Sequence, residues 1–487
     1  MRQAAWALAV LGALAVWTPA AAQVGLETPP PTTPGGKRYD QLCASCHGPG
    51  GRGAQAPNLV DPVWKYGGGD AAIALSIAKG HAPQMPAFEG VLDAPAIGEL
   101  VAYLKESSKA VAADANVSAP EIPSLGPPKG IVRSAVADFR VEHVVKVGVP
   151  YGFDFLPDGR ILITEIAGAL RIVDKGRLAP DPVRGAPTGD AASLNTYFKR
   201  GLLDVAVHPD AKSNGWVYLG TTRRIAVAGG EPFVQARISR GRIVGDRWLD
   251  DRTLLEFPLP QINAMRMAFD KQRRLYLSTP WSDHDYAGTA AAAPSQDLGS
   301  PQGKILRMTD DGHYAPDNPF VGRPGAYPYV FSYGHREPLG FAFDADGELW
   351  EAENGPRGGD ELNHVRAGRN YGWPAITWGH RYDARPIASN PDQPGMEQPV
   401  VSWVPSPAVS AVAVYSGKAF PRWKGSLFVG SLKQKTLYRV VVRADRAVLQ
   451  ETILTDVDRI RDVAEGPEGY LYFLTDSGDL FRIVPAK

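Results

Sequence analysis

The sequence is poor in cysteine, in net charge and in long apolar runs. Its 487 residues contain only two cysteines, Cys43 and Cys46, and a disulfide across so short a loop would constrain little of the unfolded chain. Lysine plus arginine and aspartate plus glutamate number 52 each, without a basic run, which argues against nucleic acid or an anionic membrane as partner. Beyond Trp17 no apolar run is long enough to span a bilayer.

The N-terminus has the pattern of a secretory signal. Arg2 precedes an apolar stretch from Ala4 to Trp17, and small residues follow before Gln23. We therefore expect residues 1–22 to be a signal peptide and the mature protein to be periplasmic, without a membrane span.

The two cysteines belong to the stretch CASCH, which ends at His47. This spacing is typical of c-type haem: Cys43 and Cys46 form thioethers to the vinyl groups, and the next residue offers its imidazole to the iron. A thioredoxin-like redox pair or a plain disulfide is the alternative, but neither explains a histidine directly after the second cysteine. The stretch predicts covalent haem c with His47 as an iron ligand.

A second iron ligand is expected downstream, and Met85 is the favoured residue. It lies between Pro83 and Pro86, which favour an extended loop. His81 competes for the role, but ligation by methionine and histidine gives the raised potential that suits an electron acceptor.

Apolar residues at helical spacing predict a helix between residues 94 and 108, with Ile97, Leu100, Val101 and Leu104 facing inward. With a first helix running into CASCH and Met85 in a loop, residues 37–108 resemble a small all-α class I cytochrome c. Segments rich in proline and alanine flank it at residues 23–36 and 109–135, and we interpret both as linkers.

Residues 136–487 carry a repeated pattern: a short apolar run, a turn that is usually rich in Asp, Gly or Pro, and a second apolar run. The six copies are YGFDFLPDGRILITE, LLDVAVHPDAKSNGWVYLG, MRMAFDKQRRLYLST, LGFAFDADGELWEAE, AVAVYSGKAFPRWKGSLFVG and IRDVAEGPEGYLYFLTD. They begin roughly 50 to 75 residues apart, which leaves room for a four-stranded sheet per copy. The pattern predicts an all-β six-bladed β-propeller. A seven-bladed propeller with one degenerate blade, or two β-sandwiches, remain the alternatives.

Four cations interrupt this strand-like sequence. Arg336 precedes an apolar strand, Lys433 lies in the corresponding connection of a later repeat, and Arg459 and Arg461 are two residues apart, so an extended segment aims both to one side. Single loop cations are usually solvated. Four that converge on the ring axis favour a multiply anionic ligand, because arginine binds carboxylates bidentately.

The stretch EAENGPRGGDELN places Gly355 and Pro356 shortly before Asp360 and Glu361. Turn carbonyls and carboxylates are the oxygen ligands that Ca²⁺ prefers. Aspartate and glycine are also ordinary turn residues, so the pattern alone is weak.

The order of the motifs GLLDVAVHPD, GKILRMTDDG, SYGHREPLGFAF, GPRGGDELN, GRNYGWP, SLKQKTLYRV and RIRDVAEGPEG closely resembles the soluble quinoprotein sugar dehydrogenases. That family includes soluble glucose dehydrogenase and the aldose sugar dehydrogenases, six-bladed propellers that bind pyrroloquinoline quinone (PQQ) and Ca²⁺. The resemblance runs from about residue 140 to the C-terminus.

The resemblance implies roles for individual residues. Arg459 and Arg461 match the arginines that hold the PQQ carboxylates, and Lys433 and Arg336 match residues that bond its quinone side. The carbonyls of Gly355 and Pro356 match ligands of the Ca²⁺ that touches PQQ. Glu361 and Tyr371 match a second, structural calcium site.

The catalytic pocket departs from the family pattern. The family has a histidine base four residues before the arginine that matches Arg266, and this position is Ile262 here. The asparagine after Arg336 is Glu337, and the usual Gln-Asn pair is Lys199-Arg200.

Three accounts of the missing histidine stay open. Turnover proceeds slowly without a base, or Glu337 is the base, or a loop brings His284 into the pocket as the base. Our prediction is that Glu337 is the base and that Arg336 is catalytic beside it, although Glu337 simply pairing with Arg336 is an equal alternative.

The sequence therefore predicts an exported, PQQ-dependent sugar or alcohol dehydrogenase fused to its own cytochrome c. Electrons would pass from PQQ to the haem and on to a periplasmic acceptor, a cytochrome or a terminal oxidase chain. A non-catalytic propeller that binds a carbohydrate or a partner protein, with the cytochrome as a separate relay, is the alternative.

Overall fold

The computed structural model describes residues 32–47, 59, 69–80, 85, 87–114, 124–189, 201–225, 233–259, 265–281, 289–381 and 386–486. The chain divides into two compact units, residues 1–116 and 117–487. In the described ranges no helix is both long and apolar enough to cross a membrane. The predicted signal peptide lies outside the described residues, as do His81, Lys199, Arg200, Ile262 and His284.

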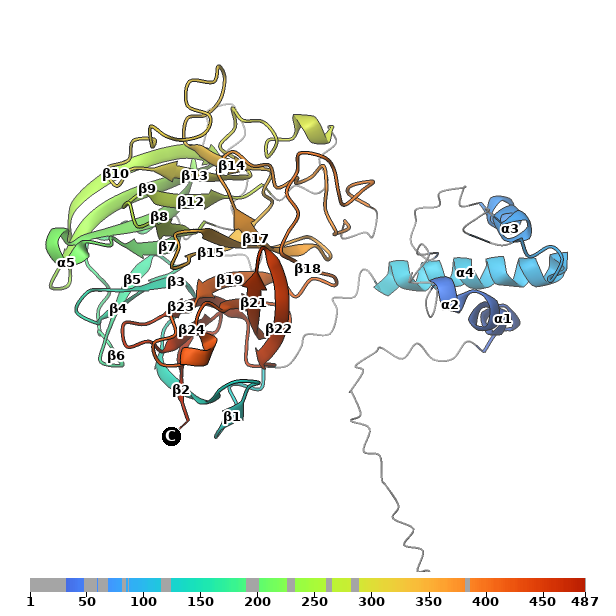
Figure 1. Cartoon of the computed structure of the whole chain (residues 1–487), viewed down its shortest axis with the longest axis horizontal. Coiled ribbons are helices and arrows are strands. Elements are labelled where there is room, and N and C mark those ends of the chain that lie inside the picture. The colour runs from blue at the N-terminus through green and yellow to red at the C-terminus, as the bar shows by residue number, and fades with distance from the viewer. Residues whose placement is uncertain are drawn as a thin grey trace, which may run out of the picture. The chain divides into compact units, whose positions relative to one another are not determined.

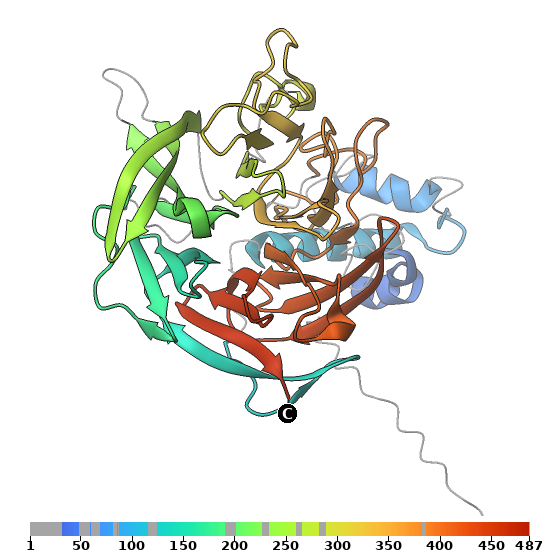
Figure 2. The same ribbon diagram turned by 60° about the vertical axis from the view of Figure 1, so that its left-hand side comes forward.

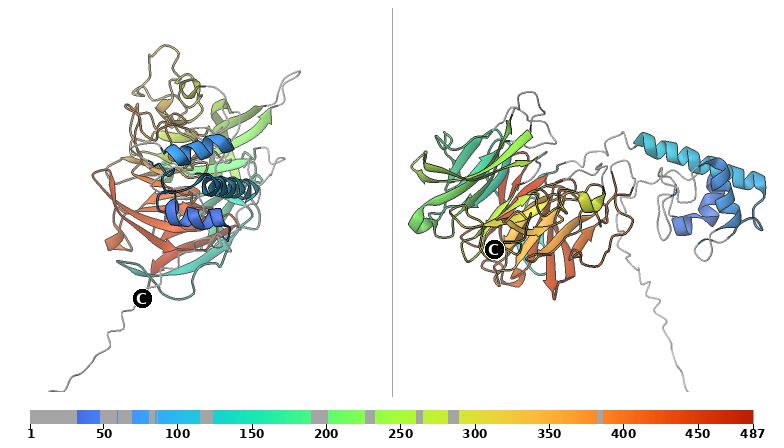
Figure 3. Two further views of the ribbon diagram at one scale, coloured as in Figure 1. Left: turned by 90° about the vertical axis from the view of Figure 1, so that its right-hand side faces the viewer. Right: turned by 90° about the horizontal axis from the view of Figure 1, so that it is seen from above.

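The first unit is helical, with α1 (Pro34–Leu42), α2 (Ala44–His47), α3 (Asp70–Lys79) and α4 (Ala94–Asp114). The hydroxyl of Thr33 accepts the N–H of Gly36, 3.1 Å away, and Pro34 occupies the first turn of α1, so this end is capped. Figure 3 shows α1 and α3 on either side of α4, and both helices contact it.

The core of this unit holds the four residues predicted to face inward from α4, together with Tyr39, Ile73 and Ile77. Helix α1 crosses α4 at Gly35. A Cβ atom at this position would lie 2.0 Å from the carbonyl oxygen of Glu99, so only glycine permits the close crossing.

The second unit contains six antiparallel sheets (Figure 1). Their strands are β3 (Pro150–Phe155), β4 (Ile161–Glu165), β5 (Ala169–Asp174) and β6 (Arg177–Leu178); β7 (Leu202–Val207), β8 (Trp216–Ile225), β9 (Phe233–Val244) and β10 (Arg247–Leu259); and β11 (Met267–Phe269), β12 (Leu275–Thr279), β13 (Lys304–Met308) and β14 (Val330–Tyr333). The others are β15 (Pro338–Phe343), β16 (Leu349–Glu353), β17 (Asp360–Val365) and β18 (Val401–Trp403); β19 (Val409–Val414), β20 (Leu427–Ser431), β21 (Leu437–Arg443) and β22 (Arg446–Leu454); and β1 (Val132–Arg133), β2 (Asp138–Lys146), β23 (Ile460–Glu465), β24 (Leu471–Thr475) and β25 (Asp479–Pro485). Among the described residues, three short helical segments lie between strands, at α5 (Ala211–Asn214), η2 (Ala290–Ala292) and η3 (Pro421–Trp423).

The six sheets are the blades of a propeller. The first strands β3, β7, β11, β15, β19 and β23 contact one another in that order, and β23 contacts β3. The last blade combines both ends of the domain, because β2 pairs with β25 from Phe139↔Pro485 to Lys146↔Asp479. Figure 2 shows this seam, with β2 beside the red C-terminal strand. The predicted six-bladed propeller is therefore confirmed.

Each of the six sequence repeats is the first hairpin of a blade, for example β3–β4 and β15–β16. Several blade strands are buried at every residue, such as β12, β16 and β24. A blade lies between two neighbours, so both of its faces are covered and its strands read as apolar runs.

Residues 124–126, which precede the first strand of the propeller, are anchored to the β22–β23 connection. The N–H of Leu125 donates to the carbonyl of Asp456 at 2.7 Å, and the N–H of Gly126 donates to Val457 at 3.1 Å. The hydroxyl of Ser124 lies 3.0 Å from the carboxylate of Asp458. The chain therefore enters the propeller at the turn that precedes Arg459.

Candidate active site

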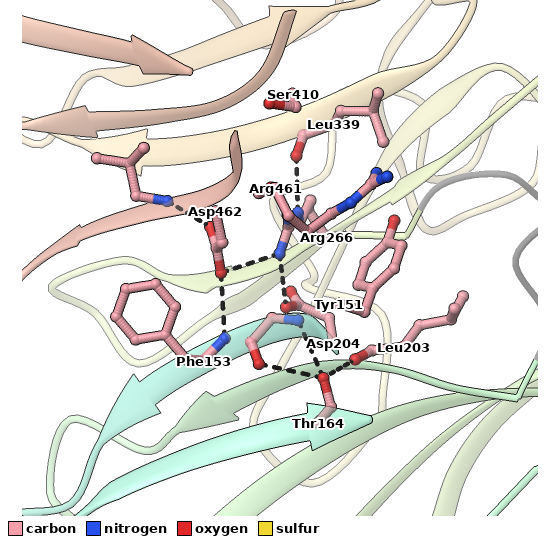
Figure 4. A network of polar contacts seen from close by, with 12 residues as sticks. Tyr151, Phe153, Thr164, Leu203, Asp204, Arg266, Leu339, Ser410, Arg461 and Asp462 are labelled. Atoms are coloured by element: carbon pink, nitrogen blue, oxygen red, sulfur yellow. Dashed lines mark hydrogen bonds and ion pairs between the residues drawn. The ribbon is translucent and has the colours of Figure 1, made fainter. Parts of the chain in front are cut away.

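One arginine ties together four of the six innermost strands (Figure 4). Arg266 lies directly before β11, and its side chain is 4% exposed. Its Nε donates to the carbonyl of Leu339 and its Nη2 to the carbonyl of Arg461, both at 2.7 Å. Its Nη1 lies 3.1 Å from the carboxylates of both Asp204 and Asp462. The side chain thus links β7, β11, β15 and β23.

The first blade reaches the same point through Tyr151 and Gly152. The guanidinium of Arg266 lies 4.8 Å from the Tyr151 ring centroid, which is a cation–π contact. A Cβ atom on Gly152 would lie 2.2 Å from Oδ1 of Asp204 and 3.0 Å from Nη1 of Arg266. Position 152 must therefore be glycine for the ion pair to form.

Charges balance around this network. Burial raises the pKa values of Asp204 and Asp462, whereas Arg266 between them lowers both. Asp476 accepts from Nε of Arg459 at 2.8 Å and from Nε of Arg461 at 2.7 Å. Three arginines, at 266, 459 and 461, thus meet the three aspartates.

The structure brings Arg336 and Glu337 to the same central region. Nη1 of Arg336 donates to the carbonyl of Asn354 at 2.6 Å and lies 3.3 Å from Oε2 of Glu337. Burial raises the pKa of Glu337, while Arg336 and then Arg461 lower it, so both arginines act on this carboxylate.

Two buried donors in this region have no hydrogen-bond partner in the described part of the chain, Nε of Arg336 and the indole N–H of Trp373. The guanidinium of Arg336 lies 5.4 Å from the Trp373 ring centroid. Buried donors normally find a partner, so this pair fits an acceptor-rich ligand such as the oxygens of PQQ.

The turn that carries Gly355 and Pro356 is held by Asp360. One carboxylate oxygen of Asp360 accepts the N–H of Gly355 at 3.0 Å, and the other accepts the N–H of Val409 at 2.8 Å. This carboxylate orients the backbone of the turn. The turn carbonyls are then the oxygen ligands that fit a calcium ion. A Cβ atom on Gly355 would lie 2.4 Å from the carbonyl oxygen of Gly358, so the turn requires glycine.

The residues of the implied second calcium site lie on and after β17. Glu361 accepts from Nδ2 of Asn363 at 3.2 Å, and burial raises its pKa. The Tyr371 ring stacks on His335 with centroids 4.6 Å apart, and its hydroxyl donates to the carbonyl of His364 at 2.7 Å. The Tyr371 hydroxyl is therefore already hydrogen-bonded, and the backbone carbonyl of Tyr371 is the group that fits a cation.

Lys433 lies in the connection between β20 and β21 and is exposed, and its N–H donates to the carbonyl of Pro407 at 3.0 Å. Arg459 is also partly exposed, at 40% of its side chain. Of the four cations noted in the sequence, Arg336 and Arg461 are buried, whereas Lys433 and Arg459 are more open.

In the helical unit, three residues predicted to bind haem are described. Cys43 follows α1, His47 ends α2, and both Cys43 and Met85 pack against the core formed by α1, α3 and α4. A thiol and a thioether beside one apolar core, with an imidazole at the end of α2, fit haem c. The backbone of Cys46 lies within α2.

Sequence reasoning missed Asp204, Asp462 and Asp476. A signal for the first two was present: Asp-Val-Ala occurs in LLDVAV and again in RIRDVAE, at equivalent positions of two innermost strands. An aspartate inside an apolar run is costly unless it is paired. This cost predicts a buried cation beside both aspartates, and that cation is Arg266.

Comparisons with known proteins assign both units to families. The family model for glucose/sorbosone dehydrogenase matches residues 147–482, and the model for subunit III of cbb3-type cytochrome c oxidase matches residues 30–104. The aldose sugar dehydrogenase YliI of Escherichia coli is 37% identical over 354 residues, 70% of this chain and 91% of YliI.

A solved structure and a cytochrome subunit extend the comparison. The PQQ-bound aldose sugar dehydrogenase of Streptomyces coelicolor superimposes with a TM-score of 0.55 at 26% identity, over 74% of this chain and 99% of that one. The oxidase subunit FixP of Bradyrhizobium diazoefficiens is 44% identical over 73 residues, 14% of this chain and 25% of FixP.

These matches cover both units: the chain belongs to the PQQ glucose/sorbosone dehydrogenase family and carries an N-terminal cbb3-type cytochrome c domain, which implies haem c.

Proposed function

We propose that this protein is a periplasmic PQQ-dependent dehydrogenase that oxidises an aldose sugar or a related alcohol and passes the electrons to its own haem. The observation that carries the proposal is the pair of buried, unpartnered donors on Arg336 and Trp373, of which Arg336 lies beside Glu337. The names of the E. coli and S. coelicolor relatives support the sugar, and the PQQ-bound form of the latter supports the cofactor.

PQQ, when bound, takes two electrons from the substrate, and haem c would carry them onward one at a time. The chain supplies the positions. Nε of Arg336 and the indole N–H of Trp373 would donate to cofactor oxygens, and Arg461, oriented by Asp476, would face its carboxylates together with Arg459. Lys433 would add charge at the open side of the site.

The carbonyls of Gly355 and Pro356 would hold the Ca²⁺ of the site, because Asp360 fixes their turn from behind. Glu361 and the carbonyl of Tyr371 would hold a second Ca²⁺. Export by residues 1–22 would place the protein in the periplasm, where a cytochrome or a terminal oxidase chain would accept the electrons.

Glu337 would take the proton of the substrate hydroxyl at a carboxylate oxygen. Its side chain is 13% exposed beside Arg336, and burial raises its pKa, which makes the carboxylate a better proton acceptor. Arg336 would orient this carboxylate from 3.3 Å.

The first test is the visible spectrum of the full chain, oxidised and supplied with PQQ, Ca²⁺ and a panel of aldoses and simple alcohols. Growth of the reduced-haem α band that requires both PQQ and one class of substrate supports the proposal. If PQQ does not bind, the non-catalytic propeller is the better account. If PQQ binds and no substrate reduces the haem, the dehydrogenase proposal fails for these substrate classes.

The second test addresses the base. Glu337→Gln is expected to lower turnover by about 10²- to 10⁴-fold. Glu256→Gln, on the partly exposed outer strand β10, is the matched control and should be unchanged. Turnover of Glu337→Gln equal to the control would leave Glu337 as a structural partner of Arg336.

A further inference from the structure

Lys304 is a buried cation that the proposed mechanism does not use. It is the first residue of β13 and is 0% exposed. Among the residues that the structure describes, no carboxylate lies within ion-pair distance of its ammonium group. Burial lowers the pKa of Lys304 to about 7, while Asp297 raises it. A lysine in such a place needs other groups to compensate the cost of burying its charge.

Three backbone carbonyls of one loop provide this compensation. Nζ of Lys304 donates to the carbonyl of Pro294 at 2.7 Å and to that of Ser295 at 3.0 Å. It also donates to the carbonyl of Gln302 at 2.6 Å. The protonated amine has three N–H donors, so each carbonyl receives one. Lys304 thus ties together both ends of residues 294–302, which belong to the β12–β13 connection.

The same loop holds the backbone of Trp373. The hydroxyl of Ser295 and Nε2 of Gln296 donate to the carbonyl of Trp373, at 2.7 and 2.8 Å. The carbonyl of Ser295 accepts the N–H of Gly334 at 2.9 Å, and the carbonyl of Gly334 accepts the N–H of Trp373 at 2.8 Å. Both backbone polar groups of Trp373 are therefore bonded, directly or through one residue, to the loop that Lys304 orders.

The direction of the Trp373 indole matters because its N–H is one of the two unpartnered donors of the site. Trp373 packs in a small buried core with Trp281 and Ala293, and Ala293 directly precedes Pro294. The guanidinium of Arg336 lies 5.4 Å from its ring centroid. The indole N–H has no hydrogen-bond partner among the described residues. Its direction therefore depends on the Trp373 backbone and on this small core.

We propose that Lys304 is a positioning residue for the cofactor site: its ammonium group orders residues 294–302, and this loop aims the indole N–H of Trp373 at the bound ligand. The inference rests on the proposed function, because it takes PQQ as the ligand of that donor. Lys304 itself would touch neither PQQ nor substrate, since its three N–H donors are already used. Its replacement should weaken PQQ binding through Trp373.

The test is a double-mutant cycle of PQQ affinity, measured by equilibrium dialysis on the full haem-containing chain with excess Ca²⁺ at about pH 6, below the pKa of Lys304. Lys304→Met and Trp373→Phe should each weaken binding about tenfold, as expected for one lost or misdirected hydrogen bond. The double variant should bind only as weakly as Trp373→Phe. Lys271→Met removes an exposed lysine that also donates to a backbone carbonyl, that of Ala345, and is the matched control, with wild-type affinity.

A purely structural role of Lys304 would give a different pattern. Lys304→Met would lower the melting temperature of the propeller in calorimetry, whereas the folded protein would keep its PQQ affinity. Equal affinity of Lys304→Met and the control would overturn the inference. Additive effects of Lys304→Met and Trp373→Phe would overturn it as well, because Lys304 would then act on the ligand by another route.

Gln296→Leu keeps the inference testable if Lys304→Met folds poorly. It removes one donor to the Trp373 carbonyl and leaves the three carbonyls around Lys304 in place. PQQ affinity should fall in the wild-type background and stay unchanged in the Trp373→Phe background, and no fall in the former refutes the inference. If wild type binds no PQQ, the proposed function fails and the inference fails with it; if wild type binds PQQ and the variants act additively, the inference alone fails.

Discussion

The Arg266 network makes a strong prediction about stability. Replacing Arg266 by methionine keeps much of the side-chain volume but leaves the carboxylates of Asp204 and Asp462 buried without their guanidinium. Removing one partner of a buried ion pair costs about 3–5 kcal/mol. Losing the donors to the carbonyls of Leu339 and Arg461 adds about 1–3 kcal/mol for each acceptor left unsatisfied. The loss is a large part of the stability of a typical domain, about 5–15 kcal/mol.

The assay is guanidinium unfolding followed by tryptophan fluorescence. Arg223→Met, which removes the exposed pair with Glu256, is the control and should cost less than about 1 kcal/mol. Adding Asp204→Asn to Arg266→Met should recover part of the loss, because one uncompensated charge is gone. If Arg266→Met is as stable as the control, the network does not join the blades as described.

Three other predictions concern separate parts of the chain. Burial raises the pKa of Asp154 to about 6 from 3.8, so its contribution to stability is present below pH 3.8 and lost as the pH rises through about 6. Asp154→Asn should therefore gain up to about 3 kcal/mol relative to wild type between pH 4 and pH 8 in denaturant titrations, and a constant difference would contradict this. In calorimetry of the full chain, Gly35→Val should lower the melting temperature of the helical unit and leave that of the propeller unchanged, because the new Cβ would collide with the carbonyl of Glu99. Gly98→Ala is the control and should change neither, because its Cβ would meet nothing within 4 Å. Chelation of Ca²⁺ should abolish tight PQQ binding in equilibrium dialysis, and unchanged affinity would argue against calcium ligation by Gly355 and Pro356.

Local sequence predicted the blades because each first hairpin is encoded within about twenty residues, by two apolar runs and a turn of Asp, Gly or Pro. The inward face of α4 followed in the same way from residues at helical spacing, such as Leu100 and Leu104. Both features depend on neighbours in the chain.

The pairing inside the site could not be predicted in this way. Arg266 meets Asp204 across 62 residues and Arg461 across 195, so only ring closure brings them together. Nothing in the local pattern indicated that Asp476 would orient Arg459 and Arg461, because it lies in the β24–β25 connection. The four cations were visible in the sequence as residue types, whereas the carboxylates that pair with them could be identified only from the fold.

The seam between β2 and β25 has a mechanical consequence. The chain enters this pair at Phe139 and leaves it at Pro485, and these two residues lie opposite each other. A force that pulls on the segment before β2 and on the C-terminus would therefore separate the paired residues one at a time, as in unzipping. The ring should open at this blade first under load, and the anchor of Ser124 and Leu125 at Asp456–Asp458 would take the pull before the seam does.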